Sequence, residues 1–168
     1  MKFSVLSTLG PLVGLATTAI AAPYTPPYFG PSVSTGPTQV DIIRTVTTIV
    51  PGRCPPNQKG GLYLWPGIAN GTGDLIQACV TSWTGNNCGQ NAEEFQWCTE
   101  ASLLYVGDTF QTVARSRNIN PTDRIKIEYV RGDPQPNGYE WEWKQFVTME
   151  ETGELLSDIS SISGNMRG

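Results

Sequence analysis

The amino-acid sequence predicts an all-β protein, folded as an antiparallel sandwich or barrel. Short segments of apolar and β-branched residues alternate with a period of two, which is typical of half-buried strands. Turns rich in Gly, Pro, Asn and Asp separate these segments at short intervals. The sequence has no sustained helical period and no internal repeat, so strands alone must supply the core.

The clearest predicted strand is residues 124–131, where Ile125, Ile127 and Tyr129 alternate with charged residues. Further strands are expected at residues 40–50, 62–65, 75–83, 95–106, 110–116, 139–150 and 155–162. The intervening turns are expected at residues 51–52, 66–67, 69–74, 107–108, 118–123, 132–138 and 152–153.

The N-terminus has the features of a cleavable signal peptide. Lys2 precedes an apolar run that closes with the small-x-small pattern Ala19-Ile20-Ala21. We therefore expect residues 1–21 to be removed and the protein to be secreted. Residues 22–38 are rich in Pro, Ser, Thr and Gly and predict a flexible lead-in, which leaves residues 39–168 as a single domain. No second apolar run is long enough to span a membrane, so we expect no membrane partner.

Composition excludes several classes of function. Without Lys2, 10 basic and 15 acidic residues remain, and no basic cluster occurs, which argues against nucleic acid as a partner. The chain has no His, which removes His-based metal sites and His-dependent nucleophilic catalysis. We expect no metal and no cofactor. Any acid–base chemistry must use Asp, Glu, Lys, Tyr or amide groups.

The cysteines predict disulfide bonds, because an even number in a secreted chain favours pairing. They are Cys54, Cys79, Cys88 and Cys98, which allow three connectivities. Cys88 and Cys98 are close in sequence, so this pair is favoured, and Cys54 is then left with Cys79. Asn70-Gly71-Thr72 is a glycosylation sequon in a Gly-rich turn, and it predicts a glycan on Asn70.

Aromatic residues are the candidate binding residues. We assign this role to Trp65, Trp97, Trp141 and Trp143, which could form a stacking surface for sugars or apolar peptides. The alternative is that a row such as Trp141 and Trp143 packs in the core or on a sheet face.

A series of segments in fixed order carries a family resemblance. They are residues 62–68 (LYLWPGI), 73–80 (GDLIQACV), 95–105 (FQWCTEASLLY), 120–127 (NPTDRIKI) and 143–156 (WKQFVTMEETGELL). Over residues 60–163 the chain resembles the eqolisin-like (glutamic peptidase) secreted proteins of filamentous fungi. The resemblance implies an antiparallel two-sheet β-sandwich of the concanavalin-like jelly-roll type. It also implies a Gln and a Glu that activate a water at acid pH, and Gln77 matches the Gln.

The chain departs from the family at two points. Ala78 and Cys79 occupy places where the family has small or Gly residues. The family's Glu lies on a strand beyond the hairpin at residues 149–154, and the sequence stops at Gly168 before such a strand. We therefore expect a shortened, incomplete sandwich with an unpaired edge; the alternative is that residues 22–50, which include the apolar strand at residues 40–50, cover that edge. Apolar residues should be exposed along that edge, at Leu155, Ile159 and Ile162.

Three functions follow from these observations. The first is a secreted protein without peptidase activity in this form, which binds extracellular polysaccharide or polypeptide. The second is an acid-acting glutamic endopeptidase that uses Gln77 and a Glu not yet assigned; Glu150, Glu151 and Glu154 lie in or beside a turn, where exposure is expected. The third is a polysaccharide-lyase-like enzyme, for which Arg124, Lys126 and Tyr129 are the available groups.

Overall fold

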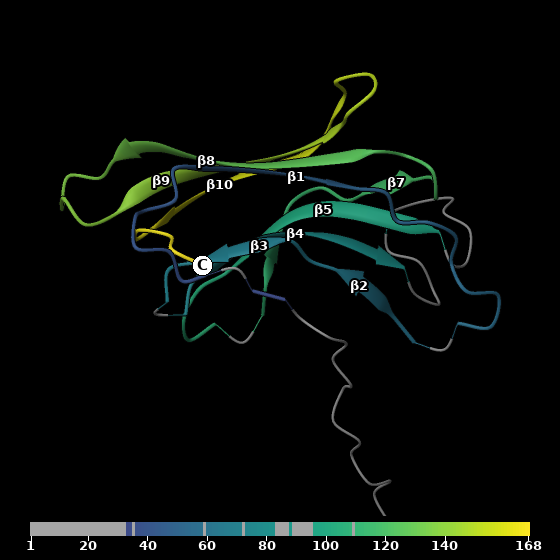
Figure 1. Ribbon diagram of the computed structural model, residues 1–168, viewed down its shortest axis with the longest axis horizontal. Coiled ribbons are helices and arrows are strands. Elements are labelled where there is room, and N and C mark those ends of the chain that lie inside the picture. The colour runs from purple at the N-terminus through teal and green to yellow at the C-terminus, as the bar shows by residue number, and fades with distance from the viewer. Residues whose placement is uncertain are drawn as a thin grey trace, which may run out of the picture. The chain divides into compact units, whose positions relative to one another are not determined.

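The computed structural model describes residues 33–34, 36–58, 60–71, 73–82, 88, 96–108 and 110–168. The predicted signal peptide and most of the lead-in lie outside this part. The described residues form two antiparallel sheets that pack face to face, and they contain no helix (Figure 1). The prediction of an all-β two-sheet sandwich is thereby confirmed. Within the described part there is accordingly no helix that could cross a bilayer.

One sheet has four strands in the order β1-β8-β9-β10. They are β1 (Arg44–Ile49), β8 (Ile125–Pro134), β9 (Trp141–Met149) and β10 (Leu155–Ser163). β1 is shorter than predicted. β8 extends into the predicted turn at residues 132–138, with a register shift between Arg131 and Pro134. Such a bulge lets a strand continue although one residue is unpaired.

The second sheet has six strands, of which β4 and β5 are the long central pair. They are β2 (Leu62–Leu64), β3 (Gly67–Ala69), β4 (Leu75–Ser82), β5 (Trp97–Leu104), β6 (Thr112–Val113) and β7 (Arg117–Ile119). β2 and β3 pair with different parts of β4, and β6 and β7 pair with different parts of β5. The expected stop at Pro66-Gly67 is therefore wrong for Gly67, which begins β3. Pro66 has no N–H and interrupts the ladder, and the backbone pairs with β4 again directly after it.

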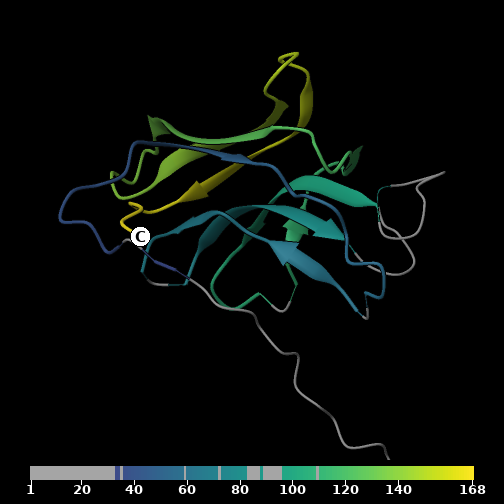
Figure 2. The same ribbon diagram turned by 45° about the vertical axis from the view of Figure 1, so that its right-hand side comes forward.

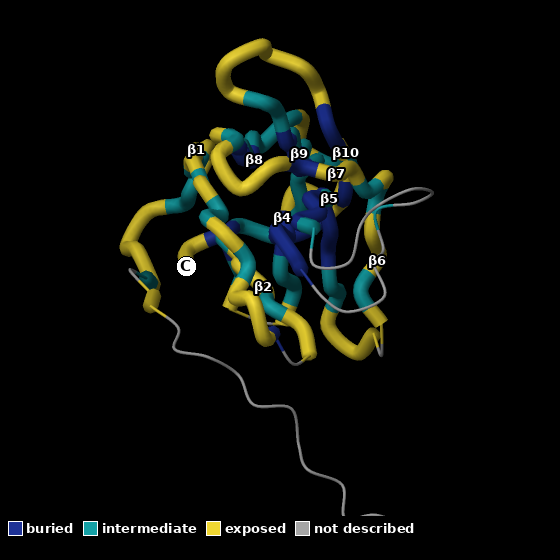
Figure 3. The backbone as a smooth tube through the Cα atoms, turned by 90° about the vertical axis from the view of Figure 1, so that its right-hand side faces the viewer, coloured by how far each residue is buried: buried dark blue, intermediate teal, exposed yellow. Residues whose placement is uncertain are grey.

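Residues of the long strands of both sheets form the hydrophobic core. Figure 3 shows buried stretches, in dark blue, along β4 and β5. Ile125, Ile127 and Tyr129 of β8 are at most 2% exposed, as their alternation predicted. Trp97 and Trp143 are also core residues, with 3% and 0% exposed surface. Their indole N–H groups donate to Gly52 O at 2.8 Å and to Gly164 O at 3.2 Å. Their assignment as binding residues is wrong, because the pleat turns both rings inward.

β10 lies at the edge of the four-stranded sheet, and in the described part no strand pairs with its outer side. Leu155 and Ile162 are 44% and 47% exposed along it, as expected for an unpaired edge, whereas Ile159 is half-buried. The turn between β9 and β10 projects from the sheet (Figure 2).

The segment after β10 closes one end of the interior. Met166 is fully buried and forms a bridge with Ile42. Beyond it, Arg167 O accepts from Thr38 N at 2.6 Å, and Arg167 N donates to Ala69 O at 3.0 Å. The segment thus contacts both the residues before β1 and the end of β3.

Candidate functional site

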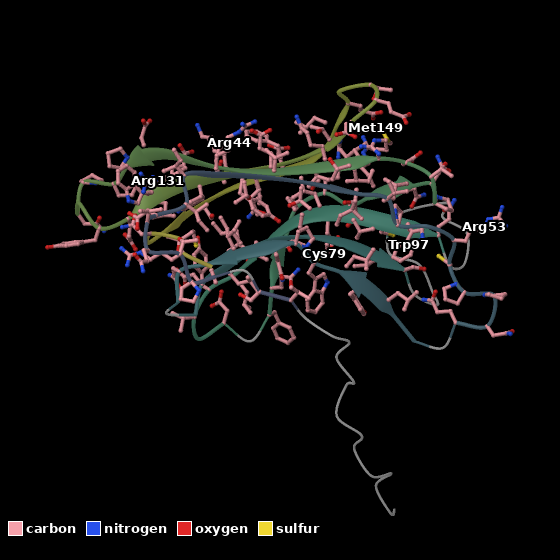
Figure 4. The ribbon with its side chains drawn as sticks, in the orientation of Figure 1. Arg44, Arg53, Cys79, Trp97, Arg131 and Met149 are labelled. Atoms are coloured by element: carbon pink, nitrogen blue, oxygen red, sulfur yellow. A yellow bond between two sulfur atoms is a disulfide. The ribbon has the colours of Figure 1, made fainter. Side chains whose placement is uncertain are left out.

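The outer face of the six-stranded sheet carries an unusual set of buried polar side chains. Because side chains alternate along a strand, Gln77 and Cys79 of β4 point away from the core, opposite to Ala78. Antiparallel register places Ser102 directly across from Gln77, and Glu100 directly across from Cys79. Figure 4 labels Cys79 in this sheet. Gln77, Cys79, Glu100, Ser102 and Gln111 are here called the outer polar strip.

Hydrogen bonds join members of the strip. The Gln77 Nε2 donates to Gln111 Oε1 at 2.7 Å, and Gln111 Nε2 lies 3.5 Å from Cys79 Sγ. Ser102 Oγ donates to Gln77 O at 3.1 Å and lies 3.5 Å from Cys79 Sγ. Gln77 is 3% exposed and Ser102 fully buried, so these bonds satisfy groups that would otherwise be costly to bury. The side chain of Gln77 is therefore held in one place by Gln111.

Cys79 is not set up as a nucleophile. Burial raises the pKa of its thiol, and the nearby Glu100 carboxylate raises it further, although hydrogen bonds from Ser102 and Gln111 act in the opposite direction. A thiol with a raised pKa stays protonated at neutral pH, and the thiolate is the reactive form. Among the described residues, no group of three or more Cys, Asp or Glu is placed to hold a metal ion.

Glu100 is the residue of this face that the sequence reasoning missed. It is half-buried, its Oε2 accepts a hydrogen bond from the Ser116 hydroxyl, and it lies diagonally across the β4–β5 pair from Gln77. Diagonal neighbours on one face of an antiparallel pair are typically about 7–8 Å apart. The period-two pattern of residues 95–106 predicts on which face of its strand Glu100 lies. It does not predict the register between β4 and β5 that brings Glu100 near Gln77.

The glutamates near the β9–β10 turn do not belong to this face. Glu150 is exposed and bonds to Arg124 and Thr48, and the Arg124 guanidinium lowers the pKa of its carboxyl. Glu151 and Glu154 are also exposed. This outcome agrees with the exposure expected for a turn.

Exposed aromatic and apolar side chains flank the outer polar strip. Tyr63 and Trp65 form an edge-to-face pair with ring centroids 5.6 Å apart and an interplanar angle of 61°. Both are 46% exposed. On the opposite side of the strip, Val113 pairs with Ser102 and is 50% exposed, and Phe110, which precedes β6 in the sequence, is 82% exposed. An exposed rim of this kind beside polar groups is typical of a binding surface.

The predicted binding tryptophans do not come together. Trp65 lies at the rim just described. Trp141 lies on β9 in the other sheet, half-buried, with the Arg131 guanidinium carbon 4.1 Å from its ring centroid. A cation held over its face occupies the surface that a stacking ligand would need.

The structure confirms one predicted disulfide and contradicts the other. Cys88 and Cys98 are bonded, with Cα atoms 5.5 Å apart. Cys79 is a thiol in the outer polar strip, whereas the Cys54 Sγ lies 3.2 Å from Ser82 Oγ. Ser82 is three residues from Cys79 on β4 and so faces the opposite side of the sheet. The predicted Cys54–Cys79 bond is therefore not formed.

Asn70, the sequon residue, takes part in a junction between the sheets. Its Nδ2 donates to Asp74 Oδ2 at 2.9 Å and to Ser163 Oγ at 3.3 Å. Its Oδ1 accepts from the backbone N–H groups of Gly73 and Asp74. Ser163 ends β10, so these bonds tie the β3–β4 turn to the other sheet. Glycosylation of Asn70 stays a prediction.

The outer face of the four-stranded sheet has a different character. Arg44 forms an ion pair with Glu128 at 2.6 Å, and Lys126 Nζ lies 3.6 Å from the same carboxylate. Exposed ion pairs of this kind contribute little to stability. Arg124 and Lys126 lie on or beside this face, whereas Tyr129 points into the core. Burial raises the pKa of the Tyr129 phenol well above its ordinary range. The structure thus separates the groups considered for a lyase, and no base is formed from them.

Comparison with models of known families, with curated proteins and with solved structures finds no match for this chain.

Proposed function

We propose that this is a secreted, eqolisin-like β-sandwich protein that binds extracellular polysaccharide or protein, without peptidase activity in this form. The binding face is the outer face of the six-stranded sheet. The observation that carries the proposal is the hydrogen-bonded outer polar strip, buried at Gln77, Cys79 and Ser102, with the exposed Tyr63–Trp65 pair and Phe110 near it in the chain's fold. Binding sites typically combine aromatic surface with a few fixed polar groups in this way.

The state of Cys79 and Glu100 supports binding over catalysis by a protein nucleophile. The Cys79 thiol has a raised pKa, and the Glu100 carboxylate accepts from Ser116. The signal-peptide pattern and the Cys88–Cys98 disulfide both support an extracellular location.

Co-sedimentation of the purified mature protein with insoluble polysaccharides, and capture on immobilised unfolded polypeptide, test the proposal. The double variant Tyr63→Ala/Phe110→Ala should lose binding. Val46→Ala is the matched control, because Val46 is 47% exposed on the other sheet. A wild-type protein that binds neither kind of polymer, or a double variant that binds as the wild type does, contradicts the proposal.

One observation favours a second candidate, an acid-acting glutamic endopeptidase. Gln77 and Glu100 lie on one face, diagonally across two paired strands. In such a pair the carboxylate would take a proton from water, and the amide would donate to the oxyanion that develops on the substrate. Its test is acid proteolysis, described in the Discussion.

A further inference from the structure

A small cavity lies beside Gln77, at the start of β3. Its volume is about 290 Å³, and the residues around it include Ser34, Trp65, Gly67, Ala69, Leu75 and Gln77. Gly168 also lines it, and among the described residues no Lys or Arg side chain does. Small-molecule sites typically have volumes of about 300–1,000 Å³, so this cavity matches one compact group and not a long segment.

The space in front of Gln77 depends on the glycine opposite it. Gly67 pairs with Gln77 across β3 and β4 and presents no side chain there. A Cβ on Gly67 would lie 3.3 Å from Gln77 Cβ, 3.1 Å from Leu75 Cδ1 and 3.2 Å from Ile76 O. These distances are tighter than ordinary van der Waals contact, so a larger residue at position 67 would narrow the cavity.

Gln77 has unused hydrogen-bonding capacity at this place. A glutamine amide offers two N–H donors and an oxygen that accepts twice. The described residues use one donor, toward Gln111 Oε1, and none of them donates to Gln77 Oε1. The side chain is held by Gln111, so the remaining donor and acceptor are fixed in direction. Both can serve a ligand that has hydroxyl groups, since a hydroxyl donates and accepts.

We infer that this cavity is a subsite for one unit of a neutral glycan, a ligand class that rests on the proposed binding function. The sugar ring lies against the exposed face of Trp65, which gives apolar contact area. Its hydroxyl groups bond to the Gln77 amide. A lining without a cationic side chain favours a neutral sugar over an acidic one, because a carboxylate buried without a cation is costly.

The edge of β3 argues against a polypeptide in the same place. An extended peptide binds a sheet by adding a strand to its edge. Here Ala69 N donates to Gly168 O, and Ala69 O accepts from Arg167 N. Residues of this chain therefore already occupy the backbone N–H and C=O of Ala69, which a peptide added along β3 would need.

Isothermal titration of the full mature protein with cellohexaose, laminarihexaose and chitohexaose tests the inference, with polygalacturonate and unfolded casein as acidic and polypeptide probes. Trp65→Ala should weaken binding of the neutral glycan about tenfold or more. Trp65→Phe should retain much of the affinity, and Gly67→Val should lower it by filling the cavity. Tyr139→Ala is the control, because Tyr139 is an 83% exposed ring between β8 and β9. Thermal unfolding of each variant establishes that it is folded.

Loss of neutral-glycan binding in Trp65→Ala and Gly67→Val, with Tyr139→Ala unchanged, supports the subsite. If a neutral glycan binds equally well to wild type, Trp65→Ala and Gly67→Val, the subsite is wrong although a binding function remains. The same conclusion follows if the protein binds casein or polygalacturonate but none of the neutral glycans. A protein that binds none of the probes contradicts the proposed function together with the inference.

Discussion

The hydroxyl of Tyr129 joins the two sheets across the core. It accepts a hydrogen bond from the Ala78 N–H and donates one to Pro66 O, each at 2.7 Å. Tyr129 belongs to β8, whereas Ala78 belongs to β4 and Pro66 separates β2 from β3. The Tyr129 side chain therefore bonds to β4, the strand that carries Gln77, and to Pro66, the residue directly before Gly67.

Tyr129→Phe should destabilise the fold by about 1–3 kcal/mol, because it removes a bonded hydroxyl and leaves the buried Ala78 N–H and the half-buried Pro66 carbonyl without it. Urea unfolding should show a lower midpoint with an unchanged slope. Tyr139→Phe, on an exposed ring, should change the free energy of unfolding by less than about 0.5 kcal/mol. Equal effects of the two substitutions would contradict the role assigned to Tyr129.

The same variant should alter the dependence of stability on alkaline pH. Burial raises the pKa of Tyr129 in the folded protein above the value of about 10 expected when unfolded. Folding thus favours the neutral phenol. Its contribution to the free energy of unfolding is complete below about pH 10 and is lost as the pH rises further. Melting temperatures measured from about pH 8 to 11 should fall less steeply for Tyr129→Phe than for wild type. If the melting temperatures of the two proteins fall equally with pH, the pKa of Tyr129 does not change on unfolding.

Cys79 should behave as a buried thiol. In the native protein it should resist alkylation, because its side chain is 3% exposed and burial raises its pKa. After denaturation without reductant, peptide mapping should find label on Cys79 and an intact Cys88–Cys98 link. Recovery of Cys79 in a peptide disulfide-linked to Cys54 would support the Cys54–Cys79 bond that the sequence predicted. It would contradict a free Cys79 thiol in the outer polar strip.

Period-two alternation predicted most of the fold, because it directly reports which side chains of a strand face the core. It placed Ile125, Ile127 and Tyr129 correctly. It did not reveal β3, since a strand of three residues exists through its pairing with β4 and has too few residues for a pattern. Short strands of this kind are defined by tertiary contacts.

The site was harder to predict than the fold. Gln77 came from a family resemblance, but its neighbour Glu100 depends on the β4–β5 register, which no local feature of either strand specifies. Residue type also failed for the tryptophans: Trp65 is at the surface and Trp143 in the core, although both lie in strand-like segments. Whether a tryptophan packs in the core or can bind a ligand depends on which face of the sheet its ring lies on.

The Asn70 junction should contribute measurably to stability. Asn70→Ala removes the bonds donated to Asp74 and Ser163 and also the acceptor of the Gly73 and Asp74 N–H groups, so the free energy of unfolding should fall by about 1–3 kcal/mol. The bond from Ser163 Oγ to Asp74 Oδ2 remains in the variant. Asn137→Ala is the matched control, because its side-chain bonds reach only to residues 139 and 140 in the same turn. Asn70→Ala should lower the melting temperature more than Asn137→Ala does. The reverse order would contradict the stabilising role assigned to the Asn70 junction.

A glycan on Asn70 would replace one of the two amide hydrogens and so displace one of these bonds. Intact mass of the secreted protein, before and after enzymatic deglycosylation, measures the occupancy of this site. A decrease in mass on treatment, absent in Asn70→Ala, would establish the predicted glycan.

Acid proteolysis separates the two candidate functions. If the protein is a binding module, it should not digest an unfolded substrate at about pH 2–4, the range in which ordinary carboxyl groups titrate. Detectable digestion that Gln77→Ala and Glu100→Gln both abolish, without unfolding the chain, would support the peptidase. Digestion that survives either substitution would show that the pair is not the site.

Backbone amide chemical-shift mapping by NMR, on titration with the polymer that binds, tests the binding face most directly. If the outer polar strip lies in the binding face, the perturbed amides should belong to residues 63–67, 77–81 and 100–113. Amides on the outer face of β1, β8 and β9, near the Arg44–Glu128 pair, should be unchanged. Perturbations confined to that charged face, with residues 63–67 and 77–81 unaffected, would contradict a binding face on the outer side of the six-stranded sheet.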